Sequence, residues 1–190
     1  MTDNRSQLLT VATHLFATHG YDAVGVQQIV EAAGVTKPTL YYYFESKQGL
    51  LAAIILEHAE LLLAIVQNAA AYDHDITRSI TELVTAYFNY AQQNPVFYRM
   101  MLAMWFSPPS SEPHLNIADL QHQQFLIIES LFKQAATDHG NMRNRHAQYA
   151  ATLKGLIDTY IALYLQGLVV NDNPELVYRL THQFMHGIFS

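Results

Sequence analysis

A short stretch near the N-terminus, GVTKPTLYYYF (residues 34–44), carries side chains suited to contacting nucleic acid. Leu40 and Phe44 stand four residues apart, so on a helix they share one face and can anchor it to a core. The hydroxyl, ammonium and phenol groups then face outward, where they can bind phosphate oxygens and base edges, and a tyrosine ring can pack on a thymine methyl group. The polar side chains are Thr36, Lys37, Thr39, Tyr41 and Tyr42, with Lys47 just beyond.

The segments around this stretch predict a helix-turn-helix. One short helix is expected over about residues 26–33 and ends at Gly34, and the next begins near Lys37 with Pro38 in its first turn, where a missing N–H costs nothing. Two short helices joined by a glycine-bearing turn have the proportions of this motif, whose second helix enters the major groove. Ser46 is expected to cap the following helix, whose first amide groups offer another phosphate site.

The whole chain is expected to be all-α, with about nine helices. Apolar residues recur at spacings of three and four, and no stretch alternates convincingly with period two. Asp73 or Asp75 can cap a fifth helix, and Gly140-Asn141 is expected to break the seventh near His139. The first expected helix ends at His19. The others cover about residues 47–71, 94–106, 141–169 and 173–190, with a loop at 107–113.

Composition limits the function classes. The 190 residues are 51% hydrophobic and 14% charged, which indicates a globular protein, and the lack of cysteine excludes disulfides and thiolate metal sites. The N-terminus has no apolar leader, and the most apolar segments fall short of the roughly 20 uninterrupted apolar residues of a membrane span. A cytoplasmic protein without membrane contact is therefore expected.

The net charge of −6 argues against a generic nucleic-acid binder. The acidic excess, however, lies beyond residue 50. The first fifty residues are about neutral, because they hold Arg5, Lys37 and Lys47 against Asp3, Asp22, Glu31 and Glu45. This distribution favours an orientation in which the N-terminal helices face DNA.

Residues 7–51 resemble the TetR family of bacterial transcriptional repressors. The matching elements are LF-x-x-x-GY, I-x-x-AAGV, T-LY-x-YF and S-K-x-x-LL, in fixed spacing. The resemblance implies a helix-turn-helix domain, expected over residues 1–46, and a ligand-binding and dimerisation domain over 47–190. It also implies base contacts by Gln27, Lys37, Pro38 and Tyr41, and phosphate contacts by Thr39, Tyr42 and Lys47.

Two departures from the family pattern concern DNA affinity. Gly25 stands where the family usually has a Thr or Ser that caps the second helix and reaches a phosphate. The N-terminal arm, often rich in arginine, offers only Arg5. Since each lost phosphate contact lowers the salt slope by about one, weaker non-specific binding and a shallower slope are expected.

Aromatic residues and methionines gather between residues 87 and 106, which favours an adaptable, mostly apolar ligand pocket. Core packing is the alternative for any single one of them. The resemblance implies an inducer bound among the fifth to eighth helices, and a mostly apolar or aromatic compound is expected. The candidate lining is Tyr87, Tyr90, Phe97, Met101, Trp105, Phe125, Leu156 and Tyr160, with His122, Gln124 and Asp158 as polar anchors.

The last two expected helices predict a homodimer. Residues 147–169 are apolar on more than one face and contain small residues, so a pair of such helices can pack against its copy as a four-helix bundle. A dimer also suits a palindromic operator on double-stranded DNA. A fully buried pair in a monomer is the alternative. The candidate contact residues are Ala151, Gly155, Ala162, Gly167, Leu180, Phe184, Met185 and Ile188.

Other functions have less support in the sequence. His182 and His186 stand one turn apart and could chelate zinc or nickel, but no third ligand lies at suitable spacing, so no metal or cofactor is expected. An enzyme using Asp158, His122 and Tyr160 lacks a nucleophile motif or phosphate loop. The chain is therefore expected to be a ligand-responsive repressor and not an enzyme, with a DNA-binding factor that has no effector as the alternative.

Overall fold

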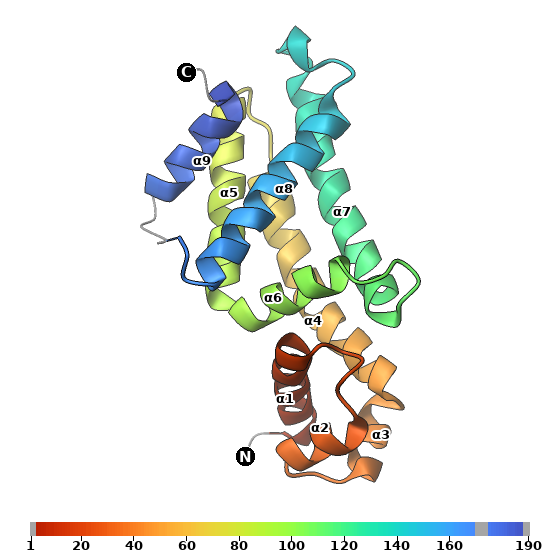
Figure 1. Ribbon diagram of the computed structural model, residues 1–190. Helices are drawn as coiled ribbons and strands as arrows, with labels where there is room; N and C mark the ends of the chain where they lie inside the picture. The colour runs from red at the N-terminus through yellow and green to blue at the C-terminus, as the bar shows by residue number, and fades with distance from the viewer. Residues whose placement is uncertain (1–2, 170–174, 188–190) are drawn as a thin grey trace. The chain divides into compact units, whose positions relative to one another are not determined.

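A computed structural model describes residues 3–169 and 175–187 of the chain, and all regular structure within these ranges is helical (Figure 1). The all-α expectation is confirmed. The elements are α1 (Asn4–His19), α2 (Val26–Ala32), α3 (Lys37–Phe44), α4 (Lys47–Ala69), α5 (Ile76–Gln93), α6 (Pro95–Trp105), α7 (Glu112–Ala135), η1 (Gly140–Met142), α8 (His146–Leu165) and α9 (Glu175–His186).

Most helix boundaries lie where the capping, proline and glycine residues of the sequence predict them. Asp75 caps α5, because its carboxylate accepts a hydrogen bond from the Arg78 amide at 3.0 Å. The junction between α7 and α8 differs from expectation. α7 ends at Ala135, and α8 begins at His146 instead of Asn141. The short η1 turn and the left-handed backbone of Asn144 (φ 61°) separate the two helices, since a residue in that conformation cannot continue an α-helix.

The chain forms two compact units. Unit 1 contains residues 1–61 and 94–120, and unit 2 contains residues 62–93 and 121–190. Helix α4 therefore contributes its first part to unit 1 and its last part to unit 2. The boundary expected at residue 46 separates two functions, whereas these units are defined by packing, so that boundary stays a prediction.

Unit 1 has a core in which α1 packs against α2, α3 and α6. Leu8, Ala12 and Phe16 of α1 are buried, and the Phe16 ring lies 5.1 Å from the ring of Tyr21. Removing apolar surface of this kind from water contributes roughly 25 cal/mol per Å2. This packing holds α2 and α3 in place on α1.

Unit 2 has its core around α5, which packs against α8 and α9. Tyr87, Phe88 and Tyr90 of α5 are each at most 1% exposed. Phe132 of α7 lies 5.9 Å from Phe184 of α9, centroid to centroid, so α9 also contacts α7 through aromatic rings. Large side chains thus fill the interior of this unit.

Helix α4 is unusually apolar, with a mean hydropathy of 2.1 over its most apolar 18-residue window. By length and composition alone it could cross a membrane, and 33% of that window is buried. A core helix of a soluble protein passes the same test. The expectation that the chain does not contact a membrane stays a prediction.

The turn between α3 and α4 fixes the end of α3. Ser46 caps α4, as expected, because its Oγ accepts a hydrogen bond from the Gly49 amide at 2.9 Å. Glu45 adopts a positive φ of 63°. A Cβ atom at Gly49 would lie 2.0 Å from the carbonyl oxygen of Phe44, so only glycine fits this close approach.

Gly49→Ala is expected to lower the free energy of unfolding by about 1–3 kcal/mol, because the added methyl group forces the α3–α4 turn apart. Urea unfolding of both proteins measures the difference. Gly25→Ser is the control, since a Cβ there meets nothing within 4 Å, and it should change stability by only a few tenths of a kcal/mol. Equal stability of Gly49→Ala and the wild type would contradict this account of the turn.

Candidate nucleic-acid interface

Helix α3 buries one face and exposes the other. Leu40 is 0% exposed and Phe44 is 6% exposed, which confirms that they anchor the helix inward. Tyr42 is 81% exposed and Tyr41 is 46% exposed. These two phenols form an aromatic, hydrogen-bonding surface on the exposed side of α3, and this face is the candidate interface.

The start of α3 combines polar side chains with the positive end of a helix. Lys37 and Pro38 are exposed, Thr39 is half-buried, and the hydroxyl oxygens of Thr36 and Thr39 lie 2.9 Å apart. The backbone amides and partial positive charge at a helix N-terminus attract anions. With the Lys37 ammonium beside them, these groups form the part of α3 best suited to a phosphate.

Helix α2 contributes one exposed candidate, Gln27, whose Nε2 donates a hydrogen bond to Glu31 Oε1 at 2.5 Å. This bond holds the amide against its own helix, so its N–H groups must exchange partners to reach a base. Gly25 is the N-cap of α2 and provides no side-chain cap. Arg5 lies with its guanidinium carbon 5.7 Å from the Phe44 ring centroid, near the end of α3.

Lys47 has an internal role that its sequence position did not reveal. Its Nζ donates hydrogen bonds to the carbonyl oxygens of Tyr21 and Val24, each at 3.0 Å, and lies 3.9 Å from the Tyr21 ring centroid. These contacts connect the start of α4 to the loop between α1 and α2. Two of the three ammonium hydrogens are therefore directed into the protein, and only the third is left for the phosphate contact expected from the resemblance.

Tyr21 extends this network to the start of α7. Its hydroxyl donates a hydrogen bond to Glu112 Oε1 at 2.7 Å. Burial, together with this hydrogen bond, raises the pKa of Tyr21, so the phenol stays protonated and remains a donor at neutral pH. Sequence reasoning missed this pair because 91 positions separate its members.

The residues expected to line a ligand pocket differ in burial. Tyr87, Tyr90, Phe97 and Met101 are at most 1% exposed. Trp105 is 37% exposed and stacks on His114 with ring centroids 5.0 Å apart. Of the others, His122 is exposed, and Phe125, Leu156, Asp158 and Tyr160 are half-buried.

A polar cluster lies inside unit 2. The Tyr87 hydroxyl donates to Gln124 Oε1 at 2.9 Å, and Lys154 Nζ donates to Asp158 Oδ2 at 2.5 Å. The same Nζ lies 5.5 Å from the Tyr87 ring centroid. Three of the expected residues are thus brought together, and Lys154, which sequence reasoning did not select, joins them.

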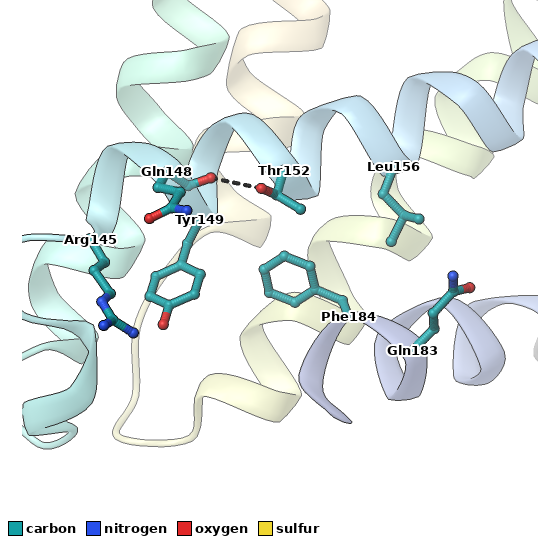
Figure 2. Close-up of a pocket in the computed structure, with 7 residues that line it drawn as sticks. All are labelled: Arg145, Gln148, Tyr149, Thr152, Leu156, Gln183 and Phe184. Atoms are coloured by element: carbon teal, nitrogen blue, oxygen red, sulfur yellow. Dashed lines mark hydrogen bonds between the residues drawn. The ribbon is translucent and has the colours of Figure 1, made fainter. Parts of the chain in front are cut away.

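A groove of about 540 Å3 lies between α8 and α9 (Figure 2). Figure 2 shows the Phe184 ring projecting between the two helices, with the Tyr149 ring beside it. The groove contains one residue expected at the ligand, Leu156, and one expected at the dimer contact, Phe184. Its lining consists of Arg145, Gln148, Tyr149, Thr152, Leu156, Gln183 and Phe184.

The residues expected at the dimer contact also differ in exposure. Ala151, Gly155 and Gly167 are exposed, and Ala162, Phe184 and Met185 are half-buried. Leu180 is 1% exposed and therefore contributes to the core of its own chain. Ile188 lies outside the described residues.

The histidine pair on α9 has no third ligand nearby among the residues that the structure describes. The rings of His182 and His186 lie 4.6 Å apart. Within residues 3–169 and 175–187, no group of three His, Asp or Glu side chains is placed to hold a metal ion.

Comparisons with known proteins place this chain beside bacterial regulators. A model described as bacterial regulatory proteins of the tetR family matches residues 8–54. The HTH-type transcriptional activator FasR of Mycolicibacterium smegmatis is 33% identical over 99 residues, which cover 52% of this chain and 45% of the relative. The chain spans about half the length of the first curated relatives that it matches.

Two solved structures share the fold over nearly the whole chain. The TetR family transcriptional regulator PfmR from Thermus thermophilus has a TM-score of 0.77 at 21% identity and covers 100% of both chains. FadR from Bacillus subtilis, solved in complex with stearoyl-CoA, has a TM-score of 0.77 at 16% identity and covers 96% of this chain and 98% of its own. At these identities the likeness is one of fold.

Lys47→Met is expected to lower the free energy of unfolding by about 1–3 kcal/mol, because it leaves two carbonyl groups without their charged donor. Lys37→Met removes the same charge from an exposed position and should change stability by less than about 0.5 kcal/mol. Urea unfolding at constant salt compares the two. Equal effects would mean that Lys47 does not stabilise the loop.

Proposed function

The chain belongs to the tetR family of bacterial regulatory proteins, and we propose from this that it is a DNA-binding transcriptional regulator. The observation that carries the proposal is the division of α3 into a buried face with Leu40 and Phe44 and an exposed face with Tyr41 and Tyr42. The exposed face, with Lys37 at its start, is the one that would enter the major groove.

The proposed contacts divide into phosphate contacts, which position α3 on DNA, and base contacts, which read its sequence. Thr36, Thr39 and the α3 N-terminus are suited to phosphates, and Tyr42 to a phosphate or a base edge. Pro38 and Tyr41 are suited to bases, and the Lys37 ammonium to a base edge or a phosphate. Gln27 on α2 is suited to a base once its amide leaves Glu31. The network around Lys47 would hold α4 and the α1–α2 loop rigid while α3 docks.

We further propose that the chain acts as a homodimer through α8 and α9. Three features support this: the groove between these helices, the half-buried Phe184 within it, and the exposed small residues Ala151 and Gly155. Small residues let two helices approach closely, and a two-fold axis places the same surface on both partners. The occupant of the groove would then be a second copy of this chain, and the binding site on DNA would be palindromic.

The proposed output is repression relieved by a small molecule. FasR is named an activator and the FadR structure holds stearoyl-CoA, so the proteins similar to this chain include an activator and a regulator with an acyl ligand. For this chain we propose a mostly apolar or aromatic effector, because buried aromatic and methionine side chains supply an adaptable interior. The effector must bind one conformer preferentially, since equal affinity shifts nothing. Helix α4, shared by both units, is the proposed lever.

An enzymatic role has no comparable support. Asp158 is paired with Lys154, and the Tyr160 hydroxyl donates to Gln183 Oε1 at 3.3 Å, while His122 is exposed. These three side chains are thus committed to different surroundings. The proposal is therefore a cytoplasmic regulator that needs no cofactor.

Lys37→Ala is expected to weaken binding to a selected DNA site about tenfold and to reduce the salt slope by about one, because it removes the exposed cation at the start of α3. Lys133→Ala is the matched control, since it removes an exposed lysine that pairs with Glu129 in unit 2. Fluorescence anisotropy at several salt concentrations measures both. Equal losses in the two variants would refute the proposed interface.

Phe184→Glu is expected to raise the dimer dissociation constant at least about thirtyfold, which corresponds to about 2 kcal/mol for a central interface residue. Sedimentation equilibrium measures this directly. Leu115→Glu introduces the same charge at a 62% exposed apolar position in unit 1 and should leave association unchanged. A wild type that sediments as a monomer at all concentrations would rule the dimer out.

A further inference from the structure

Unit 2 contains an ion pair in its interior. The side chains of Lys154 and Asp158 are 10% and 16% exposed, and they pair within α8 at 2.5 Å. Removing two charges from water costs more than their attraction commonly returns, so apolar replacements of buried pairs are often neutral or stabilising. Stability alone is therefore a poor reason for this pair.

The ion pair lies beside a second buried hydrogen bond, and Lys154 keeps N–H groups that Asp158 does not use. Tyr87 is 0% exposed and uses its hydroxyl hydrogen on Gln124 Oε1. Lys154 has three N–H groups, and Asp158 accepts one of them. The Lys154 ammonium also lies 5.5 Å from the Tyr87 ring, so the contacts connect α5, α7 and α8 in one cluster.

Gln121 adds a donor that has no acceptor. It lies one turn before Gln124 on α7, so the two amides share a helix face. Gln121 is 6% exposed, and its Nε2 atom is buried without a hydrogen-bond partner among the described residues. Buried polar groups in native proteins are nearly always satisfied, so a buried donor without a protein acceptor is a place where a ligand oxygen or a water molecule can bind.

We propose that this polar cluster, formed by Tyr87, Gln121, Gln124, Lys154 and Asp158, binds the oxygen acceptor of an otherwise apolar effector. The acceptor is a carboxylate or a carbonyl group, which takes hydrogen bonds from Gln121 Nε2 and Lys154 Nζ. The inference rests on the proposed function, because it identifies the polar group of that function's effector. A cationic effector is disfavoured, because Asp158 already has its cation and Lys154 would repel a second one.

The protonation state of Tyr87 is consistent with a site that binds an oxygen acceptor. Burial, and then the Asp158 carboxylate, raise the pKa of Tyr87, so its phenol stays neutral. A neutral hydroxyl keeps its hydrogen bond to Gln124 and leaves the ammonium as the cation available to an effector.

The test uses probes that share one alkyl tail: dodecanoate, methyl dodecanoate and dodecylamine. Calorimetric titration of the full-length wild type is expected to show binding of the acid and the ester, with dodecylamine at least tenfold weaker. Gln121→Leu should weaken the acid and the ester at least tenfold. The double variant Lys154→Met with Asp158→Leu should do the same for the acid, and it avoids leaving either charge unpaired.

Thermal unfolding separates a binding role from a structural one. Gln121→Leu removes a buried donor without a partner, so its Tm should equal or exceed that of the wild type while acid binding is lost. Lys133→Met, at an exposed position, should change neither quantity. Acid binding that is equal in the wild type and both cluster variants would overturn the proposal, as would a wild type that binds the amine as tightly as the acid or binds no probe.

A DNA-binding measurement distinguishes failure of this effector proposal from failure of the proposed regulator function. Both cluster variants should bind the selected DNA as the wild type does when no probe is present. Their complexes should then resist release by dodecanoate, which dissociates the wild-type complex. A wild type that binds dodecanoate through the cluster but no DNA would leave the cluster's ligand assignment standing and refute the regulator function instead.

Discussion

The anchoring of α3 by two apolar side chains is the constraint on which the rest depends. Leu40 and Phe44 are buried, so the residues between and before them must face outward. The turn after α3 keeps that orientation, because the Phe44 carbonyl approaches Gly49 too closely for any side chain. The exposed tyrosines are therefore a consequence of how the helix is fixed, and their chemistry becomes available to a partner.

A second set of contacts turns three separate segments into one scaffold within unit 1. Lys47 ties the start of α4 to the α1–α2 loop, and Tyr21 in that loop ties to Glu112 at the start of α7. Hydrogen bonds from a charged donor such as the Lys47 ammonium are stronger than those from a neutral donor. Movement of α4 or α7 would therefore displace the loop that precedes α2. This coupling is the physical basis for α4 as a lever in the proposed switch.

The parts of the fold that depend on local chemistry could be predicted from the sequence. Pro38, Ser46 and the periodic apolar residues mark helix starts and buried faces through neighbours a few positions away. The role of Lys47 could not, because its carbonyl partners are brought close only by packing. The pairing of Lys154 with Asp158 follows from their spacing of four on a helix, but the place of this pair beside Tyr87 depends on packing. The α7–α8 junction was also missed, since Asn144 adopts a left-handed backbone that its residue type permits but does not require.

Selection of bound duplexes from a random pool by the full-length chain tests the central claim most directly. Two copies of α3, each with its phenol-bearing face outward, should enrich an inverted repeat whose half-sites lie roughly one helical turn, about 10 base pairs, apart. Failure to enrich any sequence, or enrichment of a site without two-fold symmetry, would contradict the account.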